Sequence, residues 1–366
     1  MAGDSKIEWT NKTWNPAVGC SVVSPGCTNC YAMRMAARLQ AMERAGSIDE
    51  NGYAVRGAGP LDHYRGITKP SKAGPVWTGK INLAPEWTLT APLRWRKPAM
   101  IFVNSMSDLF HEDVLELWID FVFAVAALSP HHTFQILTKR SRRMREYLSS
   151  PNRAASIYND ACVLGVNHGL NVALIGSPEH EPFAPPGPRV HLGRWPLPNV
   201  WIGVSAEDQQ RADERIPDLL ESPAAIRWVS AEPLLGPLDL RSPSAHWQAS
   251  DSSPGLDWIV VGGESGPGAR PMHPDWARSI RDQCKAAGVA FHFKQWGEWA
   301  PAGEGPSEFL VADGTVFRSE DHHIAFAGHM KHGGAFIPAT RLKRVGKVRA
   351  GRFLDGRLHD EFPRVA

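Results

Sequence analysis

The chain has 366 residues, 43% of them hydrophobic, with 40 Lys and Arg against 38 Asp and Glu. This length allows one large domain with insertions as readily as two domains, and the apolar content supplies a sizeable core. The formal charge of +2 gives no general signal for nucleic-acid binding, and the N-terminus lacks an apolar secretory segment. No apolar run is long enough to span a bilayer, so we expect a cytoplasmic protein with reduced thiols and no membrane partner.

The cysteine segment is the first informative element along the chain. Residues 19–31 place Cys20, Cys27 and Cys30 within eleven residues, whereas the next cysteine, Cys162, follows 132 residues after Cys30. Three thiols so close together favour an incompletely ligated iron-sulfur cluster with one open iron. A zinc site completed by a distant histidine stays open as an alternative. The odd local count makes disulfides the least favoured interpretation.

Beyond this segment the chain alternates apolar runs with amphipathic stretches, which is typical of parallel strands joined by crossover helices. The expected strands are Met100–Asn104, Thr133–Thr138, Val200–Val204, Arg227–Ser230, Trp258–Gly262 and Ala290–Lys294, and another leads into the cysteine segment. The expected helices are Leu115–Leu128, Ser141–Leu148, Gln209–Leu220 and Asp275–Ala287. This pattern predicts an α/β fold, a partial (β/α) TIM-type barrel of about six to seven parallel strands with insertions.

The predicted domains are a barrel over residues 1–300 and a basic C-terminal extension over residues 301–366. The barrel carries the cluster loop 19–31 and the insertions 46–93 and 151–198, the second of which is rich in Gly and Pro. Within the first insertion, Trp77–Lys80 is expected to be a short strand. Phe353 and Leu354 should hold the extension against the barrel. Cys284 shares a helical stripe with Ile280 and is expected to be a buried apolar side chain.

A short polar cluster follows each expected strand. In a parallel barrel the carboxyl ends of the strands share one rim, where active sites form. The candidate catalytic residues are Lys139, Glu232 and Lys294, and the candidate cofactor contacts are Asn104, Ser105, Ser107, Asp108, Ser205, Glu207, Gly262, Gly263 and Glu264. Each acid could instead cap a helix, and Lys139 and Arg140 could simply pair with these acids. Recurrence at six strand ends favours a site.

Several motifs agree in content and order with one family. The matching segments are Trp14–Pro16, Gly19–Cys20, Ser24–Cys27, Cys30–Ala32, Phe102–Phe110, Leu137–Arg140, Gly203–Ser205, Ser230–Gly236, Gly262–Gly266, Lys294–Gly297 and, near the end of the chain, Gly346–Lys347, Ala350–Arg352, Leu354–Arg357 and Asp360–Pro363. With these segments the chain resembles a phage-associated three-cysteine-motif family that is radical-SAM-like and has no assigned reaction. The resemblance covers most of the chain.

The resemblance implies a 4Fe-4S cluster held by Cys20, Cys27 and Cys30, with S-adenosylmethionine (SAM) bound at the open iron. In radical SAM enzymes one electron from the cluster cleaves the sulfonium of SAM, and the resulting 5'-deoxyadenosyl radical abstracts a hydrogen atom. Ser105, Ser107 and Asp108 would take the place of the early-strand element that contacts the methionyl amino group. Six residues separate Cys20 from Cys27, where three are usual, so this longer arm must bend.

The resemblance also implies partners: SAM, an electron donor and a separately encoded three-Cys-motif protein. A phage or prophage setting favours a nucleobase, nucleotide or nucleic acid as substrate. The alternative is a zinc- or cluster-stabilised nucleic-acid-binding protein without radical chemistry, whose basic segment Arg341–Arg357 grips phosphates. A metal-dependent hydrolase ranks last because the chain lacks His-rich ligand spacing.

Overall fold

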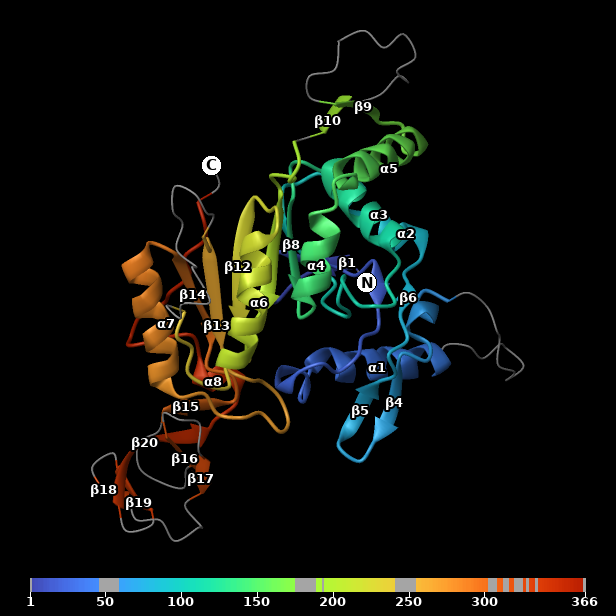
Figure 1. The fold of residues 1–366 in the computed structure, drawn as a ribbon. Helices are drawn as coiled ribbons and strands as arrows, with labels where there is room; N and C mark the ends of the chain where they lie inside the picture. Colours follow the sequence, from blue (N-terminus) through green and yellow to red (C-terminus); the bar gives the residue numbers. More distant parts are fainter. Residues whose placement is uncertain are drawn as a thin grey trace. The chain divides into compact units, whose positions relative to one another are not determined.

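The computed structural model describes residues 2–45, 59–174, 189–192, 194–240, 255–301, 308–311, 316–318, 325–326, 329–332 and 335–364. It is an α/β protein with an eight-stranded, mostly parallel sheet in the order β1-β2-β7-β8-β11-β12-β13-β14, which confirms the α/β part of the predicted fold class (Figure 1). The partial barrel stays a prediction. So do the domain bounds, because parts of both insertions and of the C-terminal extension lie outside the described residues.

The chain forms two compact units. The first comprises Met1–Val23, Ala32–Gly203 and Glu221–Ala225, and the second comprises Ser24–Tyr31, Val204–Leu220 and Ile226–Ala366. The strand β11 (Val200–Ser205) begins in the first unit and ends in the second. The cysteine segment is also divided, because Cys20 belongs to the first unit and Cys27 and Cys30 belong to the second.

Parallel strands organise the first unit. β2 (Lys12–Trp14), β7 (Met100–Val103) and β8 (Thr133–Thr138) run parallel, and β1 (Ala2–Asp4) adds antiparallel to β2. Their buried side chains are mainly apolar and have almost no exposed surface, as strands covered on both faces require. The polar Gln135 and Thr138 of β8 are also at most 1% exposed. The register aligns Trp14 with Val103 and Val103 with Ile136, so the residues that follow these strands leave the sheet at one level.

Helices cover this sheet, and two of them match the expected ranges closely. They are α3 (Glu116–Ala127) and α4 (Ser141–Leu148). Within the predicted insertion 151–198, Arg153–Asn167 forms the helix α5, which was not predicted from the sequence. Ile157, Ala161 and Leu164 are buried on α5 at the spacing of a helical face, a signal hidden by the glycines and prolines beyond residue 168.

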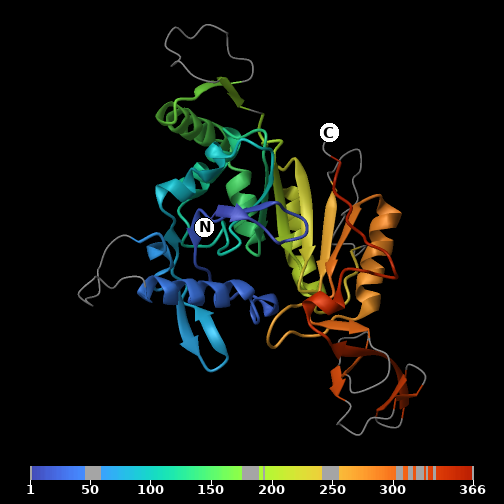
Figure 2. The same cartoon turned by 180° about the vertical axis from the view of Figure 1, so that it is seen from behind.

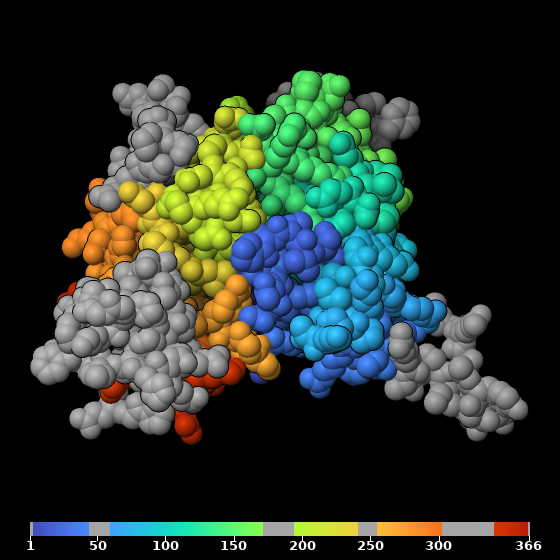
Figure 3. Space-filling view, turned by 60° about the horizontal axis from the view of Figure 1, so that its bottom comes forward, coloured from blue at the N-terminus to red at the C-terminus, as the bar shows by residue number. Residues whose placement is uncertain are grey.

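The segment after the cysteines forms a helix and a hairpin. The helix α1 is Tyr31–Ala45, and the hairpin pairs β4 (Thr68–Ser71) with β5 (Gly74–Trp77). The amide of Gln40 on α1 bonds the backbone of Thr68, which joins helix and hairpin, and their blue and light-blue atoms adjoin in Figure 3. The strand expected at residues 77–80 is therefore displaced, since Trp77 ends a strand rather than beginning one.

The second unit contains β12 (Ile226–Ala231), β13 (Trp258–Gly262) and β14 (Ala290–Gln295), all parallel. Trp228 and Trp258 are fully buried between them. α7 (Pro274–Ala287) packs on β13 and β14 (Figure 2), with Ile280 and Cys284 fully buried on its inner face. The expected role of Cys284 as a buried apolar side chain is thereby confirmed.

The C-terminal segment packs on this unit through Leu354 and Phe362, whereas Phe353, which was also expected to hold it, is 60% exposed. Leu354 is fully buried, and the ring of Phe362 stacks on Trp258 at 5.2 Å between centroids. Backbone contacts also hold the C-terminal segment against β14. Phe293 N donates to His359 O at 2.7 Å, and His292 forms an antiparallel β-bridge with Asp360. This last stretch therefore runs beside β14, the final strand of the sheet.

The remaining helices and strands complete the described chain. They are β3 (Ala17–Val18), η1 (Pro25–Cys27), η2 (Asp62–Tyr64), β6 (Asn82–Leu83), α2 (Glu86–Leu89), η3 (Ala91–Arg94), β9 (Asn171–Leu174), β10 (Arg189–Leu192), α6 (Gln209–Glu221), β15 (Trp299–Pro301), β16 (Glu308–Val311), β17 (Val316–Arg318), β18 (Ala325–Phe326), β19 (His329–His332), β20 (Ala335–Arg344) and α8 (Lys347–Ala350). Among the described residues, no helix combines the length and the hydropathy that crossing a bilayer requires.

A buried histidine in η2 gives the first testable prediction. His63 is 7% exposed, and burial lowers its pKa to about 4. The unfolded chain binds a proton near pH 6.5 and the folded chain does not, so stability should fall from pH 6.5 to pH 4, by about 3 kcal/mol at most. Urea titrations across this range should show a flatter pH dependence for His63→Phe. The exposed His168 provides a control, His168→Gln, which should keep the wild-type profile.

Candidate functional site

The cysteine segment carries its thiols on tight turns. Cys27 ends η1, and successive hydrogen bonds, Cys27 N to Ser24 O at 2.9 Å and Cys30 N to Cys27 O at 3.3 Å, bring the chain to the start of α1. Residues three apart on such turns stack on one side, which suits a pair of ligands. None of the five cysteines forms a disulfide within the described parts of the chain.

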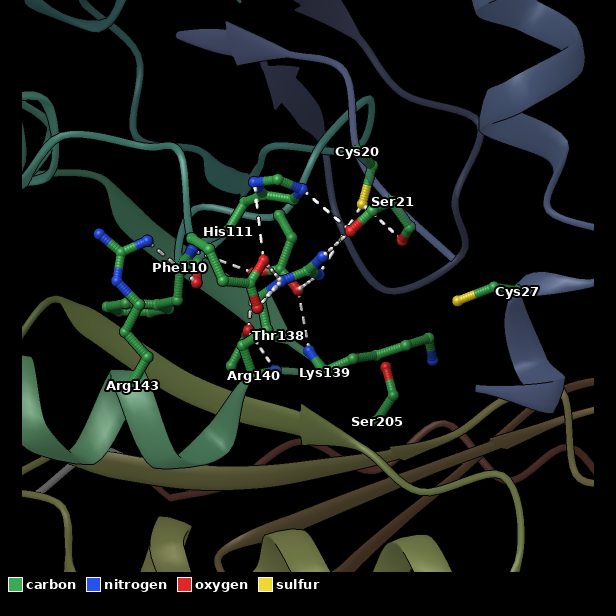
Figure 4. A network of polar contacts seen from close by, with 12 residues as sticks. Cys20, Ser21, Cys27, Phe110, His111, Thr138, Lys139, Arg140, Arg143 and Ser205 are labelled. Atoms are coloured by element: carbon green, nitrogen blue, oxygen red, sulfur yellow. Dashed lines mark hydrogen bonds and ion pairs between the residues drawn. The ribbon is translucent and has the colours of Figure 1, made fainter. Parts of the chain in front are cut away.

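In the first unit a buried guanidinium faces Cys20. Arg140 Nη1 lies 3.8 Å from Cys20 Sγ, and Arg140 Nη2 donates to Ser21 Oγ at 2.6 Å (Figure 4). Arg140 also bonds both carboxylate oxygens of Glu112 through Nε, at 3.1 and 3.0 Å. Burial opposes its charge, but Asp108, Cys20 and Glu112 together raise the pKa of Arg140 above its ordinary value. A fixed cation beside the thiol favours the thiolate of Cys20.

His111 stays neutral beside this guanidinium. Its Nδ1 accepts from Asp113 N at 3.1 Å, so its Nε2 carries the proton and donates to Ser21 Oγ at 3.0 Å. Burial lowers the pKa of His111, and the charge of Arg140 lowers it further. Ser21 is thus held by two donors, which fixes the backbone next to Cys20.

Asp108 holds Arg140 in place. Its Oδ1 accepts from Thr138 Oγ1 at 2.6 Å and from Phe110 N at 3.0 Å, and its Oδ2 accepts from Lys139 N and Arg140 Nη1, both at 3.0 Å. Both oxygens of this buried carboxylate are engaged by the chain. The structure therefore gives Asp108 a positioning role, and the alternative that Arg140 pairs with such an acid describes the observed contact.

Two of the expected cofactor contacts attach the loop after β7 to the chain that leads to Cys20. Ser105 Oγ donates to Asn15 Oδ1 at 3.1 Å, and Ser107 Oγ donates to Ala17 O at 2.8 Å. Gly19 then forms a bridge with Ser107. Gly19 has φ +100°, and a Cβ there would lie 2.0 Å from Lys80 O, so only glycine fits before the first cysteine.

Asn104 differs from its neighbours. It is 3% exposed, and neither Nδ2 nor Oδ1 of its side chain has a hydrogen-bond partner in the part of the chain that the structure describes. Its φ of +59° is left-handed, which is strained for a residue with a side chain. A buried amide without partners costs about 1–3 kcal/mol, so this position has the properties of a ligand-binding residue.

In the second unit two acids anchor the segment that bears Cys27 and Cys30. Glu207, which is fully buried, accepts from Gly26 N at 3.1 Å through Oε1 and pairs with Arg215 at 3.0 Å through Oε2. Glu264 accepts from Asn29 Nδ2 at 3.0 Å through Oε2. Two expected cofactor contacts thus position the residues that precede Cys27 and Cys30.

Glu264 also forms a two-pronged pair with Arg270, at 2.6 Å to Oε1 and 2.9 Å to Oε2. Arg270 Nη2 reaches Pro25 O at 3.0 Å. Burial favours the neutral acid, but the bonds from Arg270 and Asn29 outweigh it and lower the pKa of Glu264. The stabilisation is therefore present above the ordinary pKa near 4.3 and is lost as the pH falls through the folded value.

Removal of this guanidinium gives a second prediction. Arg270→Met should leave the 5% exposed carboxylate of Glu264 without its cation and lower the unfolding free energy at pH 7 by about 3 kcal/mol. This free-energy loss is at the lower end of the range for breaking buried ion pairs, because Arg270 is 33% exposed. The loss should shrink at pH 4, where Glu264 can bind a proton. Arg278→Met removes an exposed pair with Asp355 and should cost about 1 kcal/mol or less in the same urea experiment.

Two of the expected catalytic residues meet at the ends of β12 and β14. Lys294 Nζ lies 2.9 Å from both carboxylate oxygens of Glu232, and both side chains retain some exposure, 13% and 18%. A Cβ on Gly262 would lie 3.1 Å from the Glu232 carboxyl carbon, and one on Gly263 would lie 1.9 Å from Trp296 O. Close packing between strand ends thus explains these two glycines.

Ser205 and Lys139 take part in the structure through their backbone groups. Ser205 is buried at the end of β11, and its carbonyl accepts from Arg215 at 2.9 Å. Lys139 is half-buried, and its backbone N–H bonds Asp108. A cavity of about 360 Å³ in the first unit has apolar walls that include Leu109, Trp118 and Leu164, and no expected site residue lines it. Among the described residues no group of three or more His, Cys, Asp or Glu side chains could hold a metal ion.

Sequence reasoning missed several residues that hold the two halves of the cysteine segment. They are Asn15, Ser21, Asn29, His111, Arg215 and Arg270. Ser21 and Asn29 adjoin cysteines, and this adjacency was an available signal. The others act on residues that are distant in the sequence, and no local pattern marks them.

The fold and these contacts define an α/β protein whose cysteine segment is fixed by acidic and basic residues that follow parallel strands. The chain belongs to the family described as "Protein of unknown function (DUF5131)", whose model matches residues 4–363. Comparison with curated proteins and with solved structures found no match.

Proposed function

We propose that the protein is an iron-sulfur enzyme of radical SAM type, with a 4Fe-4S cluster on Cys20, Cys27 and Cys30 and SAM at the open iron. The observation that carries the proposal is the buried Arg140 guanidinium 3.8 Å from Cys20 Sγ, because it favours the thiolate form that binds iron. Such a cluster with SAM supplies one-electron chemistry that removes a hydrogen atom from a substrate.

The chain's own residues have distinct tasks in this proposal. Arg140 and Ser21 hold Cys20, whereas Glu207 and Glu264 hold the turns that carry Cys27 and Cys30. Asn104 offers a buried amide with an unused donor and acceptor, which suits the polar groups of a small ligand.

Lys294 and Glu232 form a hydrogen-bonded acid-base pair that remains partly accessible. The ammonium group of such a pair can donate a hydrogen bond or a proton from Lys294 Nζ to a substrate group. The proposed substrates are a nucleobase, a nucleotide or a nucleic acid.

Anaerobic reconstitution with iron and sulfide tests the proposal. Iron content and the reduced-state EPR spectrum should be recorded before and after addition of SAM. We expect about four iron atoms per chain and a cluster signal that changes with SAM. Stoichiometric zinc with no EPR-active cluster would contradict the proposal.

A nucleic-acid-binding protein with a structural zinc is the second candidate. One observation favours it: residues 341–352 contain six Lys and Arg and no Asp or Glu. This candidate predicts zinc at the cysteines and binding of nucleic acid that does not change with iron loading.

A further inference from the structure

A cationic strip lies on the surface of the second unit. It is defined here as residues 343–353, the end of β20 with α8 and the residues that follow. The exposed cations of the strip are Lys343, Arg344, Lys347 and Arg349. Phe353, at the end of the strip, is 60% exposed. Exposed cations beside an exposed aromatic ring are typical of surfaces that bind single-stranded nucleic acid.

Asp355 and Glu298 are acids that lie near the strip. Asp355 is engaged by Arg278 at 2.8 Å and by Arg281 at 2.5 Å. Hydrogen bonds from these two arginines lower the pKa of Asp355 to about 2, so its charge is balanced by cations outside the strip. Glu298 is 18% exposed and lies 3.9 Å from Arg344, a distance too long for a strong pair.

The strip is attached to the loops that carry the candidate site of the same unit. Arg344 Nη2 donates to Gly266 O at 3.0 Å, two residues after Glu264. Arg352 Nε donates to Lys294 O at 3.0 Å, and Trp296 Nε1 donates to Phe353 O at 2.9 Å. Figure 1 shows α8 beside the ends of β13 and β14, in agreement with these bonds. A strand bound along the strip would therefore pass next to Lys294 and its partner Glu232.

We propose that the strip binds single-stranded nucleic acid, with phosphates on its four exposed cations and a base stacked on Phe353. An exposed ring can receive an unpaired base, whereas the bases of a duplex are already stacked on one another. A polynucleotide is thereby named as the substrate class of the proposed enzyme. Only the statement that the bound strand is the substrate rests on the proposed function.

Fluorescence anisotropy with a labelled single-stranded DNA or RNA of about 16 nucleotides tests the proposal. Four phosphate contacts predict a slope of about −3 for the logarithm of the binding constant against the logarithm of salt concentration. The double variant Lys343→Gln/Arg349→Gln should reduce this slope by about half. Phe353→Ala should weaken binding about fivefold or more and leave the slope unchanged.

Matched controls separate the strip from general charge. Lys69→Gln/Lys72→Gln removes two exposed cations from the β4–β5 hairpin of the first unit and should leave affinity and slope unchanged. Equal loss in both double variants would overturn the proposal, and so would equal affinity for a duplex of the same length. Iron content and the SAM-dependent EPR signal of the strip variants should stay at wild-type values, so failure of the strip and failure of the proposed enzyme give different results.

Discussion

Replacement of Cys20, Cys27 or Cys30 by alanine should reduce the iron content of the reconstituted protein from about four atoms per chain to near zero. Each thiol is one of three ligands in the proposed cluster, and two thiolates cannot hold it. Loss of a group that merely orients a metal ligand costs about 10- to 100-fold in affinity, so loss of a ligand should cost at least that much. Colorimetric iron and sulfide assays after anaerobic desalting measure the effect.

The other two cysteines supply the controls for this experiment. Cys162→Ala on α5 and Cys284→Ala on α7 should retain full iron content, because neither belongs to the segment that carries the three thiols. Equal loss of iron from all five variants would show that the cysteine assignment is wrong. Retention of iron in Cys20→Ala alone would point to a ligand set without the thiol beside Arg140.

Asp108→Asn should lower the free energy of unfolding by about 3–5 kcal/mol, the cost of breaking a buried ion pair. The amide keeps the shape of the side chain, but its nitrogen cannot accept bonds from both Lys139 N and Arg140 Nη1, which now share Oδ2. Arg140 would keep only Glu112 as an ionised carboxylate partner, and that side chain is 63% exposed. Urea unfolding followed by tryptophan fluorescence measures the change.

Asp113→Asn provides the matched control, five residues along the same loop. The side chain of Asp113 is 71% exposed, so this variant should change stability by about 0.5 kcal/mol or less. A similar small change in Asp108→Asn would contradict the role assigned to the buried carboxylate. A large loss of stability with unchanged iron content would show that Asp108 supports Arg140 but is not needed for metal ligation by the cysteines.

The strands and helices could be predicted closely because their apolar periodicity is strong. Thr133–Thr138, Trp258–Gly262 and Ser141–Leu148 have the bounds expected from the sequence. The register explains the success at the strand ends only in part. Ala231, Val261 and Phe293 are aligned across the parallel strands, but a register shift after Val261 pairs Gly262 with Gln295. The meeting of Glu232 and Lys294 follows from this alignment.

The contacts that anchor the cysteine segment could not be predicted. Gly26 and Glu207 are 181 residues apart, and Asn29 and Glu264 are 235 residues apart, so no spacing rule connects them. The sequence could name Asn104 as a candidate site residue. It could not predict the left-handed backbone of Asn104, because this conformation is a property of the folded loop after β7. Helix α5 was not predicted from the sequence, because the glycines and prolines that follow it obscured its amphipathic pattern.

The last described residues act as a cover for an exposed sheet edge. β14 ends the strand order, and a terminal strand presents unpaired N–H and C=O groups that can recruit another chain. Here the carbonyl of His359 and the side chain of Glu361 accept hydrogen bonds from the backbone N–H groups of Phe293 and Phe291, respectively. The ring of Phe362 also covers Trp258. A chain truncated before residue 358 would lose this cover and should self-associate through β14, which matters for the choice of expression boundaries and of the end that carries a purification tag.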